Sequence, residues 1–213
     1  MLRAFVVLVL WMAVCQSQEL EPAPLTTFGT TVVIPSGLRG EIFFVKSGIS
    51  KLPDFDKLRK KQKPTGIIYT NALNIPPRNF REGFPGVSKR STDFAIDYTG
   101  KFWIDKPGRY DFILFSDDGS KLYIDDRLIV DNDGLHITKG VGKNLHLAGG
   151  LHTIRVSYFQ GPCGGYAPCL SLMLGIRPEG GKLRVFNTDE LKPPPNPEDW
   201  KFKPPPEPEE KPR

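Results

Sequence analysis

The stretch that decides the fold is RYDFILFSDDGSKLYIDDRLIVDNDGLH, residues 109–136. Its first seven residues form a dense aromatic and aliphatic run, which predicts a buried strand. Two further apolar segments, 121–124 and 128–130, flank the tripeptide Asp125-Asp126-Arg127. That spacing predicts a short hairpin connection in which Asp takes the positive φ that glycine usually supplies. We therefore expect antiparallel strands throughout this stretch.

Alternation of apolar and polar residues extends the strand pattern toward the C-terminus. In segment 151–158, Ile154, Val156 and Tyr158 alternate with polar residues, and four apolar positions alternate in the same way within 170–176. Segments 145–147 and 151–158 flank Ala148-Gly149-Gly150, which predicts a second tight turn. The 21 glycines and 21 prolines among 213 residues disfavour long helices. The sequence predicts one all-β domain, an antiparallel β-sandwich over residues 36–187.

The N-terminus resembles an export signal. A single basic residue, Arg3, precedes the apolar run 4–14, which is too short to cross a membrane as a helix but suits a signal peptide. We expect a signal peptide over 1–17 and a lead-in segment over 18–35, with cleavage after Ser17 or after Cys15. Lipidation of Cys15 is the less favoured alternative. The mature chain is then secreted, periplasmic or part of the cell envelope, without a transmembrane anchor.

Signal removal leaves two cysteines, Cys163 and Cys169. Two cysteines six residues apart in an exported chain predict one local disulfide, with two free thiols as the alternative. The segment 188–213 contains nine prolines after Leu191 and predicts a disordered, proline-rich tail. This tail is either a passive extension or a docking segment for a protein partner. The basic run 51–63 predicts a short surface helix or loop rather than a nucleic-acid site, because no nucleic-acid motif accompanies it.

The sequence contains no motif of a known catalytic class. It lacks the Gly-x-Ser-x-Gly elbow, the His-Glu-x-x-His zinc motif and a phosphate-binding glycine loop. Two histidines, His146 and His152, flank the predicted turn at 148–150 and would face each other across a hairpin. They are interpreted as surface histidines, with a zinc pair as the alternative. We predict that the protein is not an enzyme.

Aspartates are concentrated where the strands turn. Six of them occur between Asp117 and Asp133, and carboxylates are the ligands that calcium prefers. An EF-hand starting at Asp131 is excluded, because its fifth position is Leu135 and no Glu closes the loop. Asp131 and Asp133 are interpreted as a structural turn. Any calcium site must therefore combine loops that are separated in the sequence.

These residues carry a resemblance to the PA-fourteen domain, the protective-antigen-type β-sandwich of adhesins, toxins and glycosidases. The similarity covers roughly residues 36–176, and its motifs occur in order at Gly37–Phe43, Gly100–Phe115, Phe115–Asp125, Val130–His136 and Gly149–Gln160.

The resemblance implies a function as well as a fold. In the sugar-binding branch of the family, two adjacent aspartates joined by a cis peptide bind calcium, which in turn binds vicinal sugar hydroxyls. Asp117 and Asp118 match that pair, and Gln160 occupies the place of a side-chain amide ligand that is a shorter Asn in flocculins. The loop that follows would supply further contacts to the ligand, which we assign to Gly161, Gly164 and Tyr166.

The resemblance therefore implies an exported, calcium-dependent carbohydrate-binding module whose partner is a glycan. Two alternatives remain open at this point. One is a metal-free structural or protein-interaction domain of the cell envelope, in which the two aspartates only organise a turn. The other is an accessory subunit of a glycoside-processing enzyme.

Overall fold

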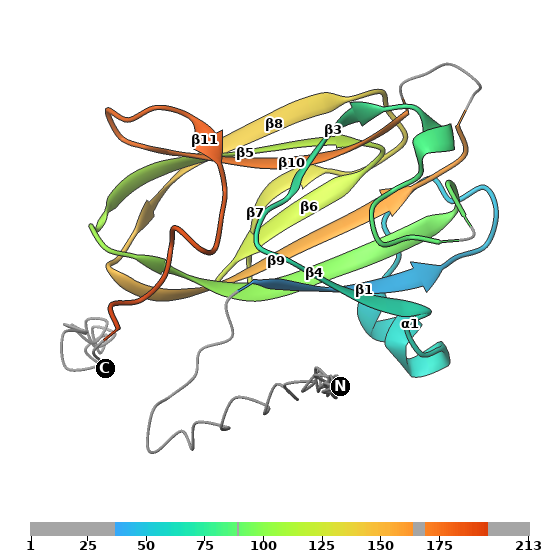
Figure 1. Ribbon diagram of the computed structural model, residues 1–213, viewed down its shortest axis with the longest axis horizontal. Coiled ribbons are helices and arrows are strands. Elements are labelled where there is room, and N and C mark those ends of the chain that lie inside the picture. Colours follow the sequence, from blue (N-terminus) through green and yellow to red (C-terminus); the bar gives the residue numbers. More distant parts are fainter. Residues whose placement is uncertain (1–36, 89, 164–168, 196–213) are drawn as a thin grey trace, which may run out of the picture. The chain divides into compact units, whose positions relative to one another are not determined.

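Two antiparallel sheets lie face to face in the computed structural model, which describes residues 37–195 except residue 89 and residues 164–168 (Figure 1). The six-stranded sheet has the order β2 (Gly66–Thr70), β1 (Leu38–Phe44), β4 (Phe94–Ile104), β9 (Gly150–Gln160), β6 (Ser120–Ile124) and β7 (Arg127–Asn132). The five-stranded sheet has the order β11 (Arg184–Val185), β10 (Leu170–Pro178), β5 (Gly108–Asp117) and β8 (Lys139–Leu147), and β3 (Asn74–Arg78) also pairs with β10. The predicted β-sandwich is confirmed.

The core lies between the two sheets and follows from the period of two in their strands. On β5, Tyr110, Phe112 and Leu114 are buried while the intervening residues are partly exposed. On β9, Val156 and Tyr158 face the same core from the opposite sheet. Because successive side chains of a strand point to opposite faces, each strand contributes every second residue to this layer.

The hairpin expected around Asp125 is present as β6 and β7. Its two connecting residues have positive φ, 49° at Asp125 and 59° at Asp126. This agrees with the prediction that Asp here adopts a left-handed conformation, which Asp tolerates better than most residues.

The interpretation of residues 148–150 as a turn between facing strands is wrong. β8 belongs to the five-stranded sheet and β9 to the six-stranded sheet, so this turn crosses from one sheet to the other. His146 is therefore paired with Arg109 on β5, while His152 is paired with Phe102 on β4. A tight turn fixes the direction of the chain but does not decide whether the two strands share a sheet.

A short helix, α1 (Phe55–Lys61), covers the outer face of the six-stranded sheet. Asp54 caps it by accepting a hydrogen bond from the Lys57 amide at 3.0 Å. Arg59 joins the helix to the sheet through ion pairs to Glu41 and to the fully buried carboxylate of Asp97. Burial opposes ionisation of Glu41, but hydrogen bonds from Arg39 and Arg59 hold its pKa below the ordinary value.

The remaining described segments are a 3₁₀ turn and a C-terminal stretch that is hydrogen-bonded to the sandwich. A 3₁₀ turn (Phe80–Glu82) follows β3. In the range assigned to the tail, the Thr188 amide bonds to the Asn71 carbonyl and the Leu191 carbonyl accepts from Trp103. Residues 196–213 lie outside the described part of the chain. Within the described residues, no helix has the length and apolar character needed to cross a membrane.

Candidate functional site

The Asp117–Asp118 pair lies where the chain passes from one sheet to the other. β5 ends at Asp117 in the five-stranded sheet, and β6 begins at Ser120 in the six-stranded sheet. The peptide bond between the two aspartates is cis, as the resemblance implies. Both side chains are buried, with 4% of Asp117 and 6% of Asp118 exposed.

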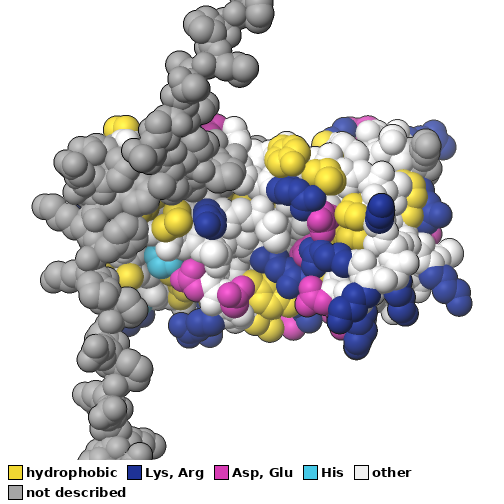
Figure 2. Space-filling view, turned by 90° about the horizontal axis from the view of Figure 1, so that it is seen from below, with side chains coloured by type: hydrophobic (Ala, Val, Ile, Leu, Met, Phe, Trp, Pro, Cys, Tyr) yellow, Lys and Arg dark blue, Asp and Glu magenta, His cyan; other side chains and the backbone are white. Residues whose placement is uncertain are grey.

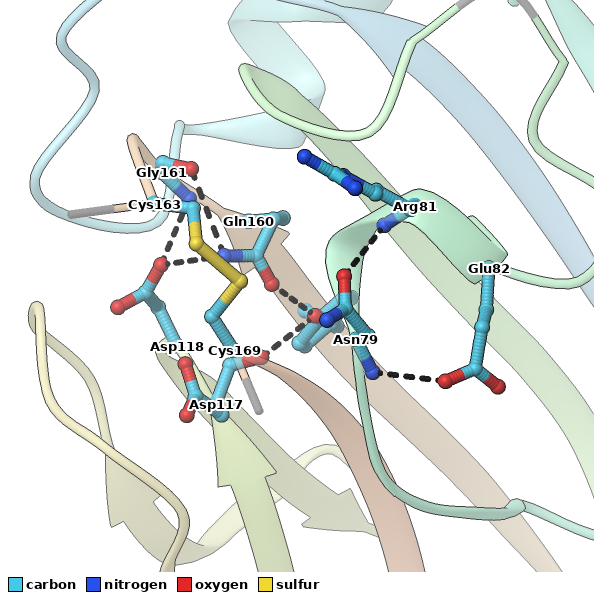
Figure 3. The surroundings of a disulfide bond; sticks show 10 residues. Asn79, Arg81, Glu82, Asp117, Asp118, Gln160, Gly161, Cys163 and Cys169 are labelled. Carbon is cyan, nitrogen blue, oxygen red and sulfur yellow. Dashed lines mark hydrogen bonds between the residues drawn. A yellow bond between two sulfur atoms is a disulfide. The ribbon is translucent and has the colours of Figure 1, made fainter. Parts of the chain in front are cut away.

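The surrounding loops donate backbone and side-chain hydrogen bonds to Asp118. Its Oδ2 accepts from the Gly161 amide at 2.9 Å and from Gln160 Nε2 at 2.9 Å. Its Oδ1 accepts from the His136 amide at 3.2 Å. The structure thus brings Asp117, Asp118, Gln160 and Gly161 together beside the disulfide (Figure 3).

Both carboxyl groups of the pair have a pKa above the ordinary value for Asp. Burial, followed by the charge of Asp118, raises the pKa of Asp117 to about 6, although hydrogen bonds from Thr138 partly oppose the shift. Burial also raises the pKa of Asp118, against the hydrogen bonds from Gly161 and His136. The charge of His136 acts on both carboxylates in the opposite direction but does not cancel either shift.

Gln160 is positioned by Tyr158, two residues earlier on the same face of β9. The Tyr158 hydroxyl lies 2.7 Å from the Asp117 carbonyl oxygen and 2.7 Å from Gln160 Oε1. Since a hydroxyl carries one proton, it can donate to only one of these two acceptors. The predicted ligand Gln160 accordingly directs its amide nitrogen, rather than its oxygen, at Asp118.

Gly161 is packed so closely that a side chain at this position would clash with its neighbours. A Cβ at this position would come within 2.6 Å of Leu135 Cδ2, 2.7 Å of the Ile49 carbonyl oxygen and 3.4 Å of Asp118 Oδ2. Glycine is therefore required for the close approach of three chain segments. The predicted disulfide is present between Cys163 and Cys169, whose Cα atoms are 6.1 Å apart. The predicted contacts Gly164 and Tyr166 lie outside the described residues.

Asp131 and Asp133 hold the loop between β7 and β8, in agreement with their interpretation as a structural turn. Asp133 Oδ1 accepts from the Leu52 amide at 2.8 Å and from the Gly134 amide at 2.9 Å. Lys121 forms ion pairs with both aspartates. This arrangement presents the backbone of residues 136–138 to the Asp117–Asp118 pair.

The two histidines considered for zinc do not form a pair. His152 Nδ1 lies 2.6 Å from Asp125 Oδ2, and its Nε2 lies 3.0 Å from the Ala148 carbonyl oxygen. His152 therefore joins two turns, in the half of the sandwich away from the aspartate pair. The contribution of His136 and Thr138 to the candidate site was missed. The motif Val130–His136 carries no information on which loop it approaches, and Thr138 lies outside it.

The donor set fits a hard cation. The described residues contain no cluster of three or more His, Cys, Asp or Glu side chains. Calcium, however, also accepts amide and carbonyl oxygens, and the site offers two carboxylates, a side-chain amide and the Gly161 carbonyl. Two adjacent, buried carboxylates are themselves a reason for a cation to bind, because it would offset their repulsion and desolvation.

Comparison with solved structures identifies similar folds. A sugar-binding PA14 domain from an RTX adhesin is 17% identical, with a TM-score of 0.56 over 72% of this chain and 96% of that one. The epithelial adhesin 9 A domain from Candida glabrata, in complex with Galb1-3GlcNAc, is 12% identical, with a TM-score of 0.52 over 74% and 88%.

An anti-sigma factor domain-containing protein is 20% identical, with a TM-score of 0.57 over 75% of this chain. The alignment spans only 49% of that protein's length.

A search of curated proteins gave no match. The family model of the PA14 domain, the PA-fourteen domain named above, matches residues 36–184. Because this match covers well over half of the sequence, the chain belongs to the PA14 domain family.

Proposed function

We propose that the chain is an exported carbohydrate-binding module in which calcium bridges the Asp117–Asp118 pair and vicinal hydroxyls of a glycan. The observation that carries the proposal is the pair itself: two adjacent, buried carboxylates, one of which has its pKa raised to about 6 by burial and by the charge of the other. The sugar-binding RTX adhesin domain and the glycan-bound Candida adhesin support a glycan as the ligand class.

Gln160 and Tyr158 offer a second argument for a cation. If the Gln160 amide is reversed, its nitrogen donates to the Tyr158 hydroxyl, which then donates to the Asp117 carbonyl. Each group in this chain is then correctly paired. The amide oxygen would then replace the nitrogen 2.9 Å from Asp118 Oδ2. Two oxygens at that separation repel each other unless a cation lies between them.

Asp117, Asp118, Gln160 and the Gly161 carbonyl would hold the ion, which supplies open coordination positions for sugar hydroxyls. We propose no catalytic role for any of these residues. Since a single small contact area gives weak binding, attachment to a glycan-coated surface would use several copies of the module.

Calorimetry with calcium chloride tests the metal site directly. The wild-type chain is expected to bind calcium, and Asp118→Asn to bind it at least tenfold more weakly. Glycan arrays read in calcium and again in EDTA then test the ligand class. Calcium binding without any calcium-dependent glycan signal would reject carbohydrate binding but keep the metal site.

The metal-free alternative has a specific observation in its favour. Asp118 already accepts three hydrogen bonds from the protein, which is what a turn-organising carboxylate would do. This alternative predicts no heat on calcium addition.

The accessory-subunit alternative predicts co-purification with a glycoside-processing enzyme. Export is tested by sequencing the N-terminus of the protein recovered outside the producing cells, which should start at residue 16 or 18.

A further inference from the structure

The net positive charge of the protein is concentrated in one short segment. Residues 45–63, here called the basic segment, contain seven basic and two acidic residues, a net charge of +5. The whole chain also has a net charge of +5, so the remaining residues, 22 basic and 22 acidic, are neutral together. Figure 2 shows Lys and Arg side chains gathered at the right-hand end of the molecule, the end that carries α1 in Figure 1.

Most of this charge has no internal partner. Arg59 is bound to carboxylates of the sheet, and Lys57 pairs with Asp54. The other lysines of the basic segment form no ion pair within the described residues and are exposed: Lys46, Lys51, Lys60, Lys61 and Lys63. Unpaired like charges repel, so this concentration weakens the isolated fold and favours an anionic ligand.

A hollow of about 430 Å³ opens between the first part of the segment and α1. Phe44, Ile49, Pro53 and Leu58 contribute apolar surface to its lining, while Lys46 and Lys51 supply two ammonium groups. Apolar side chains with lysines beside them suit a pyranose ring that carries an anionic substituent. The ring's C–H face can contact the apolar side chains while the anion pairs with the lysines.

This hollow adjoins the candidate site at Ile49. Ile49 lines the hollow, and its carbonyl oxygen lies against Gly161, whose amide binds Asp118. A second link joins the Leu52 amide to Asp133, in the loop that also carries His136. A glycan of a few residues could therefore reach both places without a change in the fold.

We infer that the hollow binds an acidic sugar, a uronate or a sulfated residue, of the same glycan that reaches Asp117 and Asp118. The inference rests on the proposed function. It assigns the basic segment to ligand selection, in which the aspartate pair engages vicinal hydroxyls and Lys46 and Lys51 select chains with a negative charge nearby.

Other polyanions fit the segment less well. A membrane surface would require apolar side chains that can insert, but none of the exposed large hydrophobic residues lies in 45–63. Single-stranded nucleic acid would require exposed aromatic rings for base stacking, whereas Phe44 is half-buried and Phe55 is buried.

The test compares trigalacturonate with its methyl ester in calcium, using the full chain and titration calorimetry. Both ligands have the same hydroxyls, but the ester lacks the charge, and chains this short avoid calcium-driven gelling. We expect the acid to bind roughly three- to thirtyfold more tightly, as two partly exposed ion pairs would give. Lys46→Glu/Lys51→Glu should remove that preference without weakening ester binding. The matched control Lys101→Glu/Lys143→Glu changes the same charge elsewhere and should keep the preference.

The outcomes separate this inference from the proposed function. Equal binding of acid and ester, or loss of preference in the control variant alone, overturns the inference while the calcium site stands. Tighter binding of double-stranded DNA or phosphatidylserine vesicles than of the acid, abolished in Lys46→Glu/Lys51→Glu, overturns it in favour of a different partner. If neither sugar binds in the wild type, the inference is rejected, and the glycan arrays decide separately whether the aspartate pair binds another carbohydrate. Calorimetry with calcium alone still reports on the metal site.

Discussion

Replacing Asp117 by Asn is expected to stabilise the protein in EDTA while abolishing its response to calcium. Asn keeps the shape of the side chain and an oxygen that can accept from Thr138. It removes the negative charge, and the neighbouring Asp118 then ionises without a like charge beside it.

The magnitude follows from the pKa of Asp117. The fold raises this pKa from 3.8 to about 6, a change of about two units, and each unit corresponds to roughly 1.4 kcal/mol. An acid with a raised pKa contributes full stability below its unfolded value and loses that contribution as the pH rises through the folded value. At pH 7.5 the ionised group therefore costs about 2–3 kcal/mol, which Asn would recover.

Thermal unfolding in EDTA measures the effect. At pH 7.5 the variant should melt about 5–10 °C above the wild type, since 1 kcal/mol shifts the midpoint of a domain this size by roughly 2–4 °C. At pH 4 the difference should almost vanish, because the wild-type carboxyl is then protonated in the fold. Calcium should raise the wild-type midpoint at pH 7.5 but leave the variant unchanged.

Asp111→Asn is the matched control. Hydrogen bonds from Asn144 and Arg177 lower the pKa of Asp111, so its replacement should give no gain at pH 7.5. A variant Asp117→Asn that melts below the wild type in EDTA would refute the reasoning, because the carboxylate would then be stabilising without a cation.

Three further changes test the surroundings of the pair and the contact that joins α1 to the sheet. Gly161→Ala should weaken calcium binding at least tenfold in calorimetry, because the methyl group would collide with Leu135 and the Ile49 carbonyl. The control Gly149→Ala should bind calcium normally, because the nearest atom to its methyl group would be 3.6 Å away. Tyr158→Phe should destabilise the fold by about 1–2 kcal/mol in urea unfolding, since the Asp117 carbonyl loses its buried donor, and an unchanged midpoint would contradict that role. Arg59→Ala should cost about 2–4 kcal/mol in the same assay by removing a partner of buried Asp97, whereas loss of an exposed, unpaired lysine such as Lys61 should have no measurable effect.

Short-range patterns in the sequence predicted much of the fold, whereas the candidate site residues came from the family resemblance. The β6–β7 hairpin follows from apolar runs on either side of two aspartates that tolerate positive φ. The Asp117–Asp118 pair and Gly161 were assigned from the resemblance to the PA-fourteen domain, because spacing and periodicity do not show which separate loops meet at a site.

Contacts between distant segments could not be predicted in the same way. The contact of Tyr158 with Gln160 could have been predicted, because residues two apart on a strand place their side chains on the same face. The approach of Ile49 to Gly161 could not, because it depends on how the β1–α1 connection is held by Asp133. The turn at 148–150 shows the same limit, since local spacing does not reveal which sheet the next strand joins.

The register of β4 places the candidate site and the two ends of the described chain at opposite ends of this strand. Phe94, at one end of this strand, pairs with Gln160 beside the candidate site. Leu38, where β1 starts, pairs with Gly100, and Leu191 bonds to Trp103, so both ends of the described chain leave from the other half of the strand, roughly 20–30 Å away. A tether at either end would thus hold the module at the end opposite the aspartate pair. Tension along such a tether would pass through β1 and the strands beside it without pulling on the loops that form the site.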